Sequence, residues 1–118
     1  MTGVAASAGA IAVRRGEIWW VSLDPAQGSE IRQTRPAVVI TADALNRARR
    51  TVVVVPLSTG PEPRPPIVVA APSAGQNAVA VCDQLRAVDK RRLTRTLGRL
   101  STADLQAIEE GVRRIFEL

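Results

Sequence analysis

The sequence lacks residues on which many enzymes depend: its 118 residues include no histidine, no tyrosine and a single cysteine, Cys82. Without histidine the usual zinc ligand sets cannot form, and we expect neither a metal nor another cofactor. A lone cysteine cannot form an internal disulfide, as is typical of proteins in the reducing cytoplasm. Because a catalytic cysteine usually needs a histidine partner, we interpret Cys82 as a small buried hydrophobic residue.

Long apolar runs are missing as well. No stretch approaches the ~20 residues that a membrane-spanning helix requires, and residues 1–13 lack the basic start of a signal peptide. We therefore expect a cytoplasmic protein with no membrane association. Residues 1–13 are predicted to form a disordered tail, and 14–118 a single domain with one core.

Aromatic residues are few, and the charge is unbalanced. The aromatic side chains are Trp19, Trp20 and Phe116, too few for the base-stacking platform of many single-strand-binding proteins. The net charge of +5 favours an anionic partner, which is either a nucleic acid or an acidic protein. A basic surface that serves only solubility is the alternative.

Short apolar segments separated by turn residues predict a mainly β fold. The expected strands cover residues 17–23, 37–41, 51–55, 67–70, 78–82, 84–88 and 97–100. We also expect a short helix over 45–49, capped by Asp43, and a proline-rich loop over 58–66. Residues 89–94 are predicted to form a basic turn or short helix. Many short strands and one long helix argue for a small barrel rather than a βαβ fold.

The clearest element is a C-terminal helix. Ser101 is a good N-cap, and Asp104 three residues later predicts a capping box with Asp in place of Glu. Apolar residues at helical spacing give the helix one buried face: Leu105, Ile108, Val112 and Ile115. The exposed side is expected to carry two i,i+4 ion pairs, Glu109–Arg113 and Glu110–Arg114.

Polar residues in loops beside apolar strands are the candidates for chemistry. Arg35 stands before Pro36, which holds the preceding backbone extended and so directs the arginine side chain. A guanidinium there can clamp a phosphate through two hydrogen bonds; the alternative is an ion pair with a loop carboxylate. Glu30 is the nearest carboxylate in sequence, and it either acts as a base or pairs with Arg32 or Arg35.

Two further places carry candidate residues. Ser58 and Thr59 follow the third strand, where a hydroxyl bonds either a substrate or its own backbone. Gln84 can read a base edge or make a buried structural hydrogen bond, and Arg86 can hold a backbone phosphate. The basic run 90–92, with Arg95, is interpreted as a solvated face that attracts RNA through its long-range field.

These segments, taken in order, resemble the MazF/PemK toxin family over nearly everything from Arg15 to Leu118. The matching segments are Arg15-Gly16-Glu17-Ile18-Trp19 with Leu23-Asp24-Pro25, Gly28-Ser29-Glu30, Thr34-Arg35-Pro36-Ala37-Val38-Val39-Ile40, Val55-Pro56-Leu57-Ser58-Thr59 and Cys82-Asp83-Gln84-Leu85-Arg86. Each segment is weak alone, and their shared order and spacing make the resemblance specific.

The resemblance implies an SH3-like small barrel of the CcdB/MazF type, with short helices, a C-terminal α-helix and assembly as a homodimer. It implies a toxin of a type II toxin–antitoxin system that inhibits translation and growth. The implied reaction is metal-independent, sequence-specific cleavage of single-stranded RNA by attack of the 2′-hydroxyl, which leaves a 2′,3′-cyclic phosphate and a 5′-hydroxyl. A cognate acidic antitoxin would occupy the RNA groove, and no DNA binding by the chain itself is expected.

The resemblance also assigns roles to residues. Arg35 and Ser58 match the catalytic pair, and Glu30 matches an acidic position with a supporting or base role. Gln84 and Arg86 lie in a segment that contacts RNA, and Ser29 and Arg32 are predicted RNA contacts beside Glu30. Many members carry Thr where this chain has Ser58, and the adjacent Thr59 can share that role. Some PemK-type members use an additional histidine and arginine, whose places here hold Ser29 and Val81.

Two rival functions stay open at this stage. One is a non-catalytic SH3-like module that binds RNA or protein through its basic surface. The other is a gyrase poison of the CcdB type, which shares the barrel but acts through a Trp near its C-terminus. This chain ends Ile115-Phe116-Glu117-Leu118 and carries Arg35 and Ser58 instead.

Overall fold

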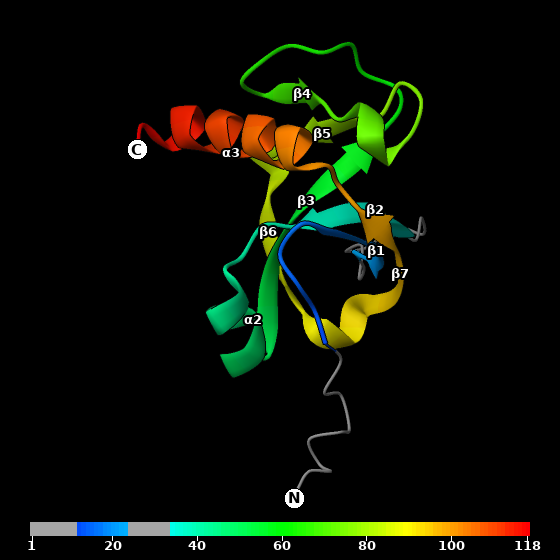
Figure 1. Cartoon of the computed structure of the whole chain (residues 1–118), viewed down its shortest axis with the longest axis vertical. Coiled ribbons are helices and arrows are strands. Elements are labelled where there is room, and N and C mark those ends of the chain that lie inside the picture. The colour runs from blue at the N-terminus through cyan, green and yellow to red at the C-terminus, as the bar shows by residue number, and fades with distance from the viewer. Residues whose placement is uncertain (1–11, 24–33) are drawn as a thin grey trace, which may run out of the picture.

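Seven strands pair into one antiparallel sheet that coils around an apolar interior (Figure 1). The computed structural model describes residues 12–23 and 34–118. The strands are β1 (Glu17–Ser22), β2 (Thr34–Val39), β3 (Thr51–Ser58), β4 (Val68–Ala70), β5 (Val79–Val81), β6 (Arg86–Asp89) and β7 (Leu93–Arg99). Their order is β4-β5-β3-β2-β1-β7, and β6 also pairs with β3. Within the described residues no pairing joins the two outer strands, so the sheet is curled but open.

Helical segments cover the ends of this sheet. They are α2 (Asp43–Ala48), α3 (Thr102–Phe116) and three short 3₁₀ turns, η1 (Pro72–Ala74), η2 (Cys82–Gln84) and η3 (Lys90–Arg92). In Figure 1, α3 lies across β4 and β5 at one end of the molecule, and α2 lies at the other. The predicted mainly β fold with short helices and a C-terminal α-helix is confirmed. No described helix is long and apolar enough to cross a membrane.

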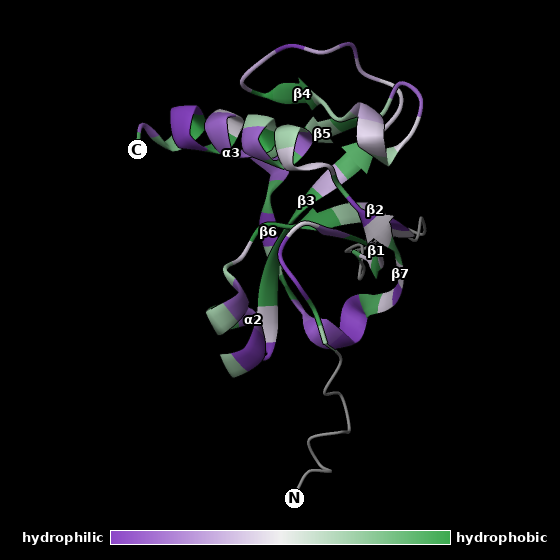
Figure 2. Ribbon diagram, in the orientation of Figure 1, coloured by the Kyte–Doolittle hydropathy of each residue, from purple (hydrophilic) through white to green (hydrophobic). Residues whose placement is uncertain are grey.

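Apolar side chains on both faces of the central strands form two clusters. Because successive strand residues point to opposite faces, Ile18 joins one cluster, whereas Trp19 joins the other. Val38 and Val39 separate in the same way, and both are fully buried. Figure 2 shows the apolar residues concentrated along β2 and β3. Val13 is also buried, at 5% exposure, so packing begins just before the predicted boundary at residue 14.

Three strands, β2, β3 and β7, are longer than predicted. β2 already begins at Thr34, because β1 pairs with it through Ser22↔Thr34 and Val21↔Arg35. β7 begins at Leu93, a buried residue opposite Val21, rather than at residue 97.

β3 continues through Pro56, where the sequence predicted its end. Val53 O accepts from Ile40 N, so the odd-numbered backbone groups of β3 face β2 and the nitrogen of Pro56 faces the other edge. On that edge β3 pairs with β6 as far as Val54 and with β5 from Leu57 onward. Pro56 therefore falls in the gap between two partner strands, where its missing N–H breaks no ladder bond.

The C-terminal helix begins as predicted but is anchored differently. Ser101 Oγ accepts from Asp104 N at 3.1 Å, which confirms the N-cap. The expected capping box does not close, because the Asp104 carboxylate accepts from Ser73 N at 2.7 Å and from Ser73 Oγ. Ser101 N in turn donates to Ser73 Oγ at 2.9 Å. The start of α3 is thereby tied to η1.

The predicted apolar face of α3 is confirmed, whereas its predicted ion pairs are wrong. Ile108 is fully buried, and Val112 and Ile115 pack against the same cluster. Glu109 pairs with Arg15 from another part of the chain, and Glu110 lies 4.0 Å from Arg113 rather than beside Arg114.

The short helix also differs from its prediction. It spans Asp43–Ala48, with Ala42 at the N-cap and no side-chain cap. Asp43 does not cap the helix, because its carboxylate accepts from Arg15 N at 2.7 Å and from Asn46 Nδ2 at 3.3 Å.

Candidate active site

The ends of β2 and β3 bring two predicted site residues together. The register pairs Val38 with Val55 and Ala37 with Pro56. Continued by two residues, the same register places Arg35 opposite Ser58. The sequence separates these residues by 23 positions, and antiparallel pairing makes them neighbours across the sheet.

Arg35 and Ser58 line one pocket of about 410 Å³. Most of its wall is apolar, formed by Ile18, Trp20, Pro36, Leu57, Ala74, Ala78 and Leu97, and Gly75 and Thr59 complete it. A concave, mainly apolar site with a few converging polar groups is the usual form of a ligand pocket. Apolar walls also strengthen the electrostatic action of the polar groups they surround.

Ser58 is the half-buried hydroxyl of this pocket. Its Oγ accepts a long hydrogen bond of 3.4 Å from Gly60 N, which resembles the loop-capping alternative considered above. A hydroxyl that only accepts still has its own proton to donate. Thr59, next along the chain, also lines the pocket, but it is exposed where the loop begins.

Arg35 is held by the strand pairing on its other side. β1 pairs with this segment through Trp20↔Pro36 and Val21↔Arg35, and Arg35 is half-buried. Pro36 thus does what the sequence predicted, because it sits in an extended strand directly after the arginine. The partners predicted around it, Ser29, Glu30 and Arg32, lie outside the described residues.

Gln84 and Arg86 lie apart from this pocket. Gln84 ends η2 and Arg86 begins β6; both are exposed, so the buried alternative for Gln84 is wrong. Arg86 pairs with Val54, four residues before Ser58 on β3, a distance of about 13 Å along a strand. The structure therefore does not bring these two residues to the Arg35–Ser58 pocket.

Trp20 and Leu97 are pocket residues that the sequence interpretation missed. Trp20 is half-buried, and Leu97 is 41% exposed on the neighbouring strand β7. The signal was present for Trp20, because two successive tryptophans in one strand must face opposite sides. Trp19 belongs to the core, so its neighbour had to face elsewhere.

Cys82 is a core residue, as predicted. It is fully buried at the start of η2. Burial, and secondarily the charge of Asp83, raises the pKa of its thiol to about 11. The thiol therefore stays protonated at neutral pH, where a nucleophile would need the thiolate.

Comparisons with known proteins agree with one another. A family model described as the PemK-like, MazF-like toxin of type II toxin–antitoxin systems matches residues 14–116. Endoribonuclease MazF9 of Mycobacterium tuberculosis is 36% identical over 115 residues, which cover 90% of this chain and 98% of MazF9. Endoribonuclease PemK of Escherichia coli is 39% identical over 107 residues, which cover 76% of this chain and 80% of PemK.

Solved structures share the fold at lower identity. A MazE–MazF crystal structure from Deinococcus radiodurans matches with a TM-score of 0.78 and 22% identity, covering 92% of this chain and 98% of the other. An endoribonuclease in complex with its cognate antitoxin, from a mycobacterial species, matches with a TM-score of 0.75 and 20% identity. The match covers 91% of this chain and 97% of the other. The family match spans the strands, the pocket and α3 together. The chain therefore belongs to the PemK-like, MazF-like family of type II toxin–antitoxin toxins.

Proposed function

We propose that this chain is the toxin of a toxin–antitoxin system and cleaves single-stranded RNA as a metal-independent endoribonuclease. The observation that carries the proposal is the pairing of Arg35 with Ser58 in one mainly apolar pocket. Relatives named as endoribonucleases, at 36% and 39% identity, support it. A reaction without a metal fits a chain that has no histidine.

The reaction uses a nucleophile that the RNA itself supplies. The 2′-oxygen attacks the adjacent phosphorus, a new 2′-O–P bond forms, and the bond from phosphorus to the 5′-oxygen breaks. The products are a 2′,3′-cyclic phosphate and a 5′-hydroxyl, and one proton moves from the 2′-oxygen to a base while the 5′-oxygen takes one up. No covalent enzyme intermediate is needed.

Arg35 and Ser58 act on the charge that develops at phosphorus. An arginine side chain stays protonated in proteins, so Arg35 is suited to neutralising the phosphorane rather than to being the resting base. It is also a proton donor for the leaving 5′-oxygen. Ser58 donates a hydrogen bond to a non-bridging oxygen. One preorganised donor of this kind is worth ~10²–10³ in rate.

Glu30 is our proposal for the group that takes the 2′ proton. It is the nearest carboxylate to Arg35 in sequence and matches the acidic position of the family. If it is the base, Glu30→Gln lowers turnover and removes the acidic limb of the pH–rate profile. Full turnover across pH would assign the base elsewhere.

The assembly is proposed from the family. We infer that the chain works in the cytoplasm as a homodimer and is inhibited by an acidic antitoxin segment that covers the RNA-binding pocket. Related structures are named as complexes with an antitoxin, and the net charge of +5 suits an acidic partner.

The test is incubation of the purified chain with a long single-stranded RNA in EDTA, beside Arg35→Ala and the control Arg114→Ala. Arg114 is an exposed arginine on α3 outside the pocket. We expect discrete cuts at a common short motif, with 5′-hydroxyl ends, that are lost in Arg35→Ala and kept in Arg114→Ala. Intact RNA with binding retained would instead indicate the binding module, and gyrase inhibition the CcdB-type poison.

A further inference from the structure

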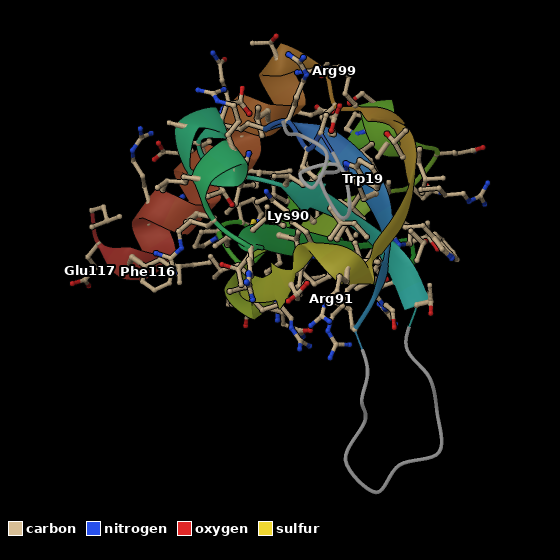
Figure 3. All side chains as sticks on the ribbon, turned by 90° about the horizontal axis from the view of Figure 1, so that it is seen from below. Trp19, Lys90, Arg91, Arg99, Phe116 and Glu117 are labelled. Atoms are coloured by element: carbon tan, nitrogen blue, oxygen red, sulfur yellow. The ribbon has the colours of Figure 1, made fainter. Side chains whose placement is uncertain are left out.

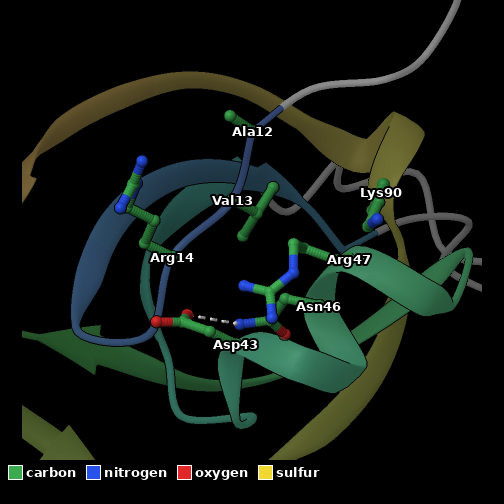
Figure 4. A pocket seen from close by; sticks show the side chains of 7 residues that line it. All are labelled: Ala12, Val13, Arg14, Asp43, Asn46, Arg47 and Lys90. Atoms are coloured by element: carbon green, nitrogen blue, oxygen red, sulfur yellow. Dashed lines mark hydrogen bonds between the residues drawn. The ribbon is translucent and has the colours of Figure 1, made fainter. Parts of the chain in front are cut away.

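A second pocket lies beside α2 (Figure 4). We call it the basic pocket; its volume is about 290 Å³ and its lining is Ala12, Val13, Arg14, Asp43, Asn46, Arg47 and Lys90. It shares no lining residue with the Arg35–Ser58 pocket. Its residues come from the segment before β1, from α2 and from the start of η3.

The described lining of the basic pocket carries more positive than negative charge. Arg14, Arg47 and Lys90 face one carboxylate, Asp43, which leaves +3 − 1 = +2. None of these three cationic side chains makes a hydrogen bond or ion pair with any described residue, whereas the nearby Arg91 pairs with Asp89. Converging unpaired cations are the electrostatic signature of an anion site.

Asp43 belongs to the frame of this pocket. Its carboxylate accepts from Arg15 N and from Asn46 Nδ2. The hydrogen bond from Arg15, followed by smaller contributions from Asn46 and the neighbouring arginines, lowers the pKa of Asp43. The carboxylate thus helps to hold two chain segments together, and its single negative charge offsets one of the three cations of the lining.

The floor of the basic pocket is built from buried groups. Asn46 is 1% exposed, and its Nδ2 also donates to Thr41 O at 2.8 Å. These two acceptors fix the amide orientation, and Oδ1 has no partner within the described residues. Lys90 N donates to Arg50 O at 2.8 Å, which ties η3 to the turn between α2 and β3. Backbone hydrogen bonds therefore hold the segments that carry Arg47 and Lys90, so a bound anion has to order only their side chains.

We propose that the basic pocket binds a backbone phosphate of the RNA substrate, at a point remote from the phosphate that is cut. This rests on the proposed ribonuclease function. Each nucleotide of RNA carries a phosphate, so a strand held at Arg35 and Ser58 presents others at a high effective concentration. The exposed, apolar Ala12 offers a surface for the attached sugar. Figure 3 shows Lys90 on the same face of the molecule as Arg91, its neighbour in η3.

A phosphate contact positions a strand but does not read its sequence. The basic pocket should therefore raise the affinity for long RNA, with no effect on the cleavage motif or on the chemical step. For single-stranded nucleic acids, the logarithm of the binding constant falls linearly with the logarithm of the salt concentration. Each phosphate contact that is removed makes this slope shallower by ~0.7.

The experiment compares Arg47→Ala, Lys90→Ala and the charge reversal Arg47→Glu with Arg114→Ala. Long RNA should show an increase in KM of about tenfold for each alanine variant, and more for Arg47→Glu, with kcat and the cut motif unchanged. A short oligonucleotide that carries only the motif should show no difference. Thermal unfolding checks that the variants fold, as expected for the exposed Arg47.

Binding is measured separately, by titrating salt in a Ser58→Ala background. The slope should fall by ~0.7 in Arg47→Ala and stay unchanged in Arg114→Ala. Lys90 is the only lysine of the chain, so an amine-reactive label followed by peptide mass spectrometry reports on the pocket directly. We expect RNA to protect Lys90 from the label.

Three results would overturn the proposal: an unchanged salt slope, unprotected Lys90, or a KM change equal for long and short RNA. Loss of affinity for an acidic peptide with RNA affinity intact would assign the basic pocket to a protein partner. A wild-type chain that cuts no RNA would refute the proposed function, while the Lys90 labelling would still decide whether RNA binds here.

Discussion

The two pockets of this molecule differ in how their polar groups are held. The Arg35–Ser58 pocket places a few polar groups within apolar walls, at the ends of paired strands. The cations of the basic pocket come from the segment before β1, from the short helix α2 and from the 3₁₀ turn η3. Strand pairing in an apolar setting suits the positioning of a reacting phosphate, and clustered charge suits the holding of a polyanion. The comparison therefore indicates that the Arg35–Ser58 pocket suits the reaction and the basic pocket suits the binding of the RNA strand.

The largest expected effect comes from the hydroxyl of the Arg35–Ser58 pocket. Ser58→Ala should lower kcat by ~10²–10³, because it removes one preorganised donor to the developing charge. Thr59→Ala is the matched control, since Thr59 is exposed and lies one residue further along. Single-turnover cleavage of a defined RNA measures both. Equal losses in the two variants would mean that Thr59 shares the role.

Gly111 tests the packing of α3 against β4 and η2. A Cβ there would lie 2.9 Å from Pro66 O, 3.1 Å from Val69 Cγ2 and 3.3 Å from Cys82 Sγ. Gly111→Ala gains ~1 kcal/mol of helix propensity, but a backbone oxygen has to move, so we expect a net loss of about 1–3 kcal/mol in the free energy of unfolding.

Urea denaturation measures this change, and Gly60→Ala is the control. A Cβ at Gly60 meets nothing within 4 Å, so its effect should stay within about 0.5 kcal/mol. Unchanged or raised stability in Gly111→Ala would show that α3 shifts freely over β4.

Replacing Trp20 tests whether the two pockets differ in the salt dependence of RNA binding. If a base stacks on its ring, Trp20→Ala weakens RNA binding by ~1–3 kcal/mol and leaves the salt slope as in the wild type. Removal of Arg47 should also weaken RNA binding, by about tenfold, but with a lower salt slope. Titration of RNA binding at several salt concentrations compares the two variants. A slope that falls in Trp20→Ala would place a phosphate contact there.

The smallest expected effect concerns Cys82. Its thiol has a raised pKa of about 11 in the folded chain, against 9.0 for an ordinary thiol. Between these values the unfolded chain loses the proton and the folded chain keeps it, so the free energy of unfolding falls as pH rises from about 9 towards 11. Cys82→Ala should remove that part of the pH dependence. Rapid alkylation of the native thiol at pH 7 would contradict its burial.

Local sequence patterns predicted much of the fold. Short apolar segments between turn residues located all seven strands, although their limits shifted where pairing extended them, as at Leu93 and Pro56. The cap at Ser101 and the apolar face of α3 were also readable, because both depend on residues within a turn or two of each other. The ion pairs of Glu109 and Glu110 were not, since Arg15 approaches from a distant part of the chain.

By itself the sequence determined the strand-forming segments, the C-terminal helix, the buried cysteine and a candidate arginine fixed by Pro36. Only the tertiary structure decided which of these residues meet. The register of β2 on β3 sets Arg35 opposite Ser58. Contacts of α2 with the segment before β1, and of η3 with the residue before β3, bring together Arg14, Arg47 and Lys90. The reason is physical: propensity and periodicity act over a few residues, whereas register and charge convergence depend on packing between segments that the chain separates widely.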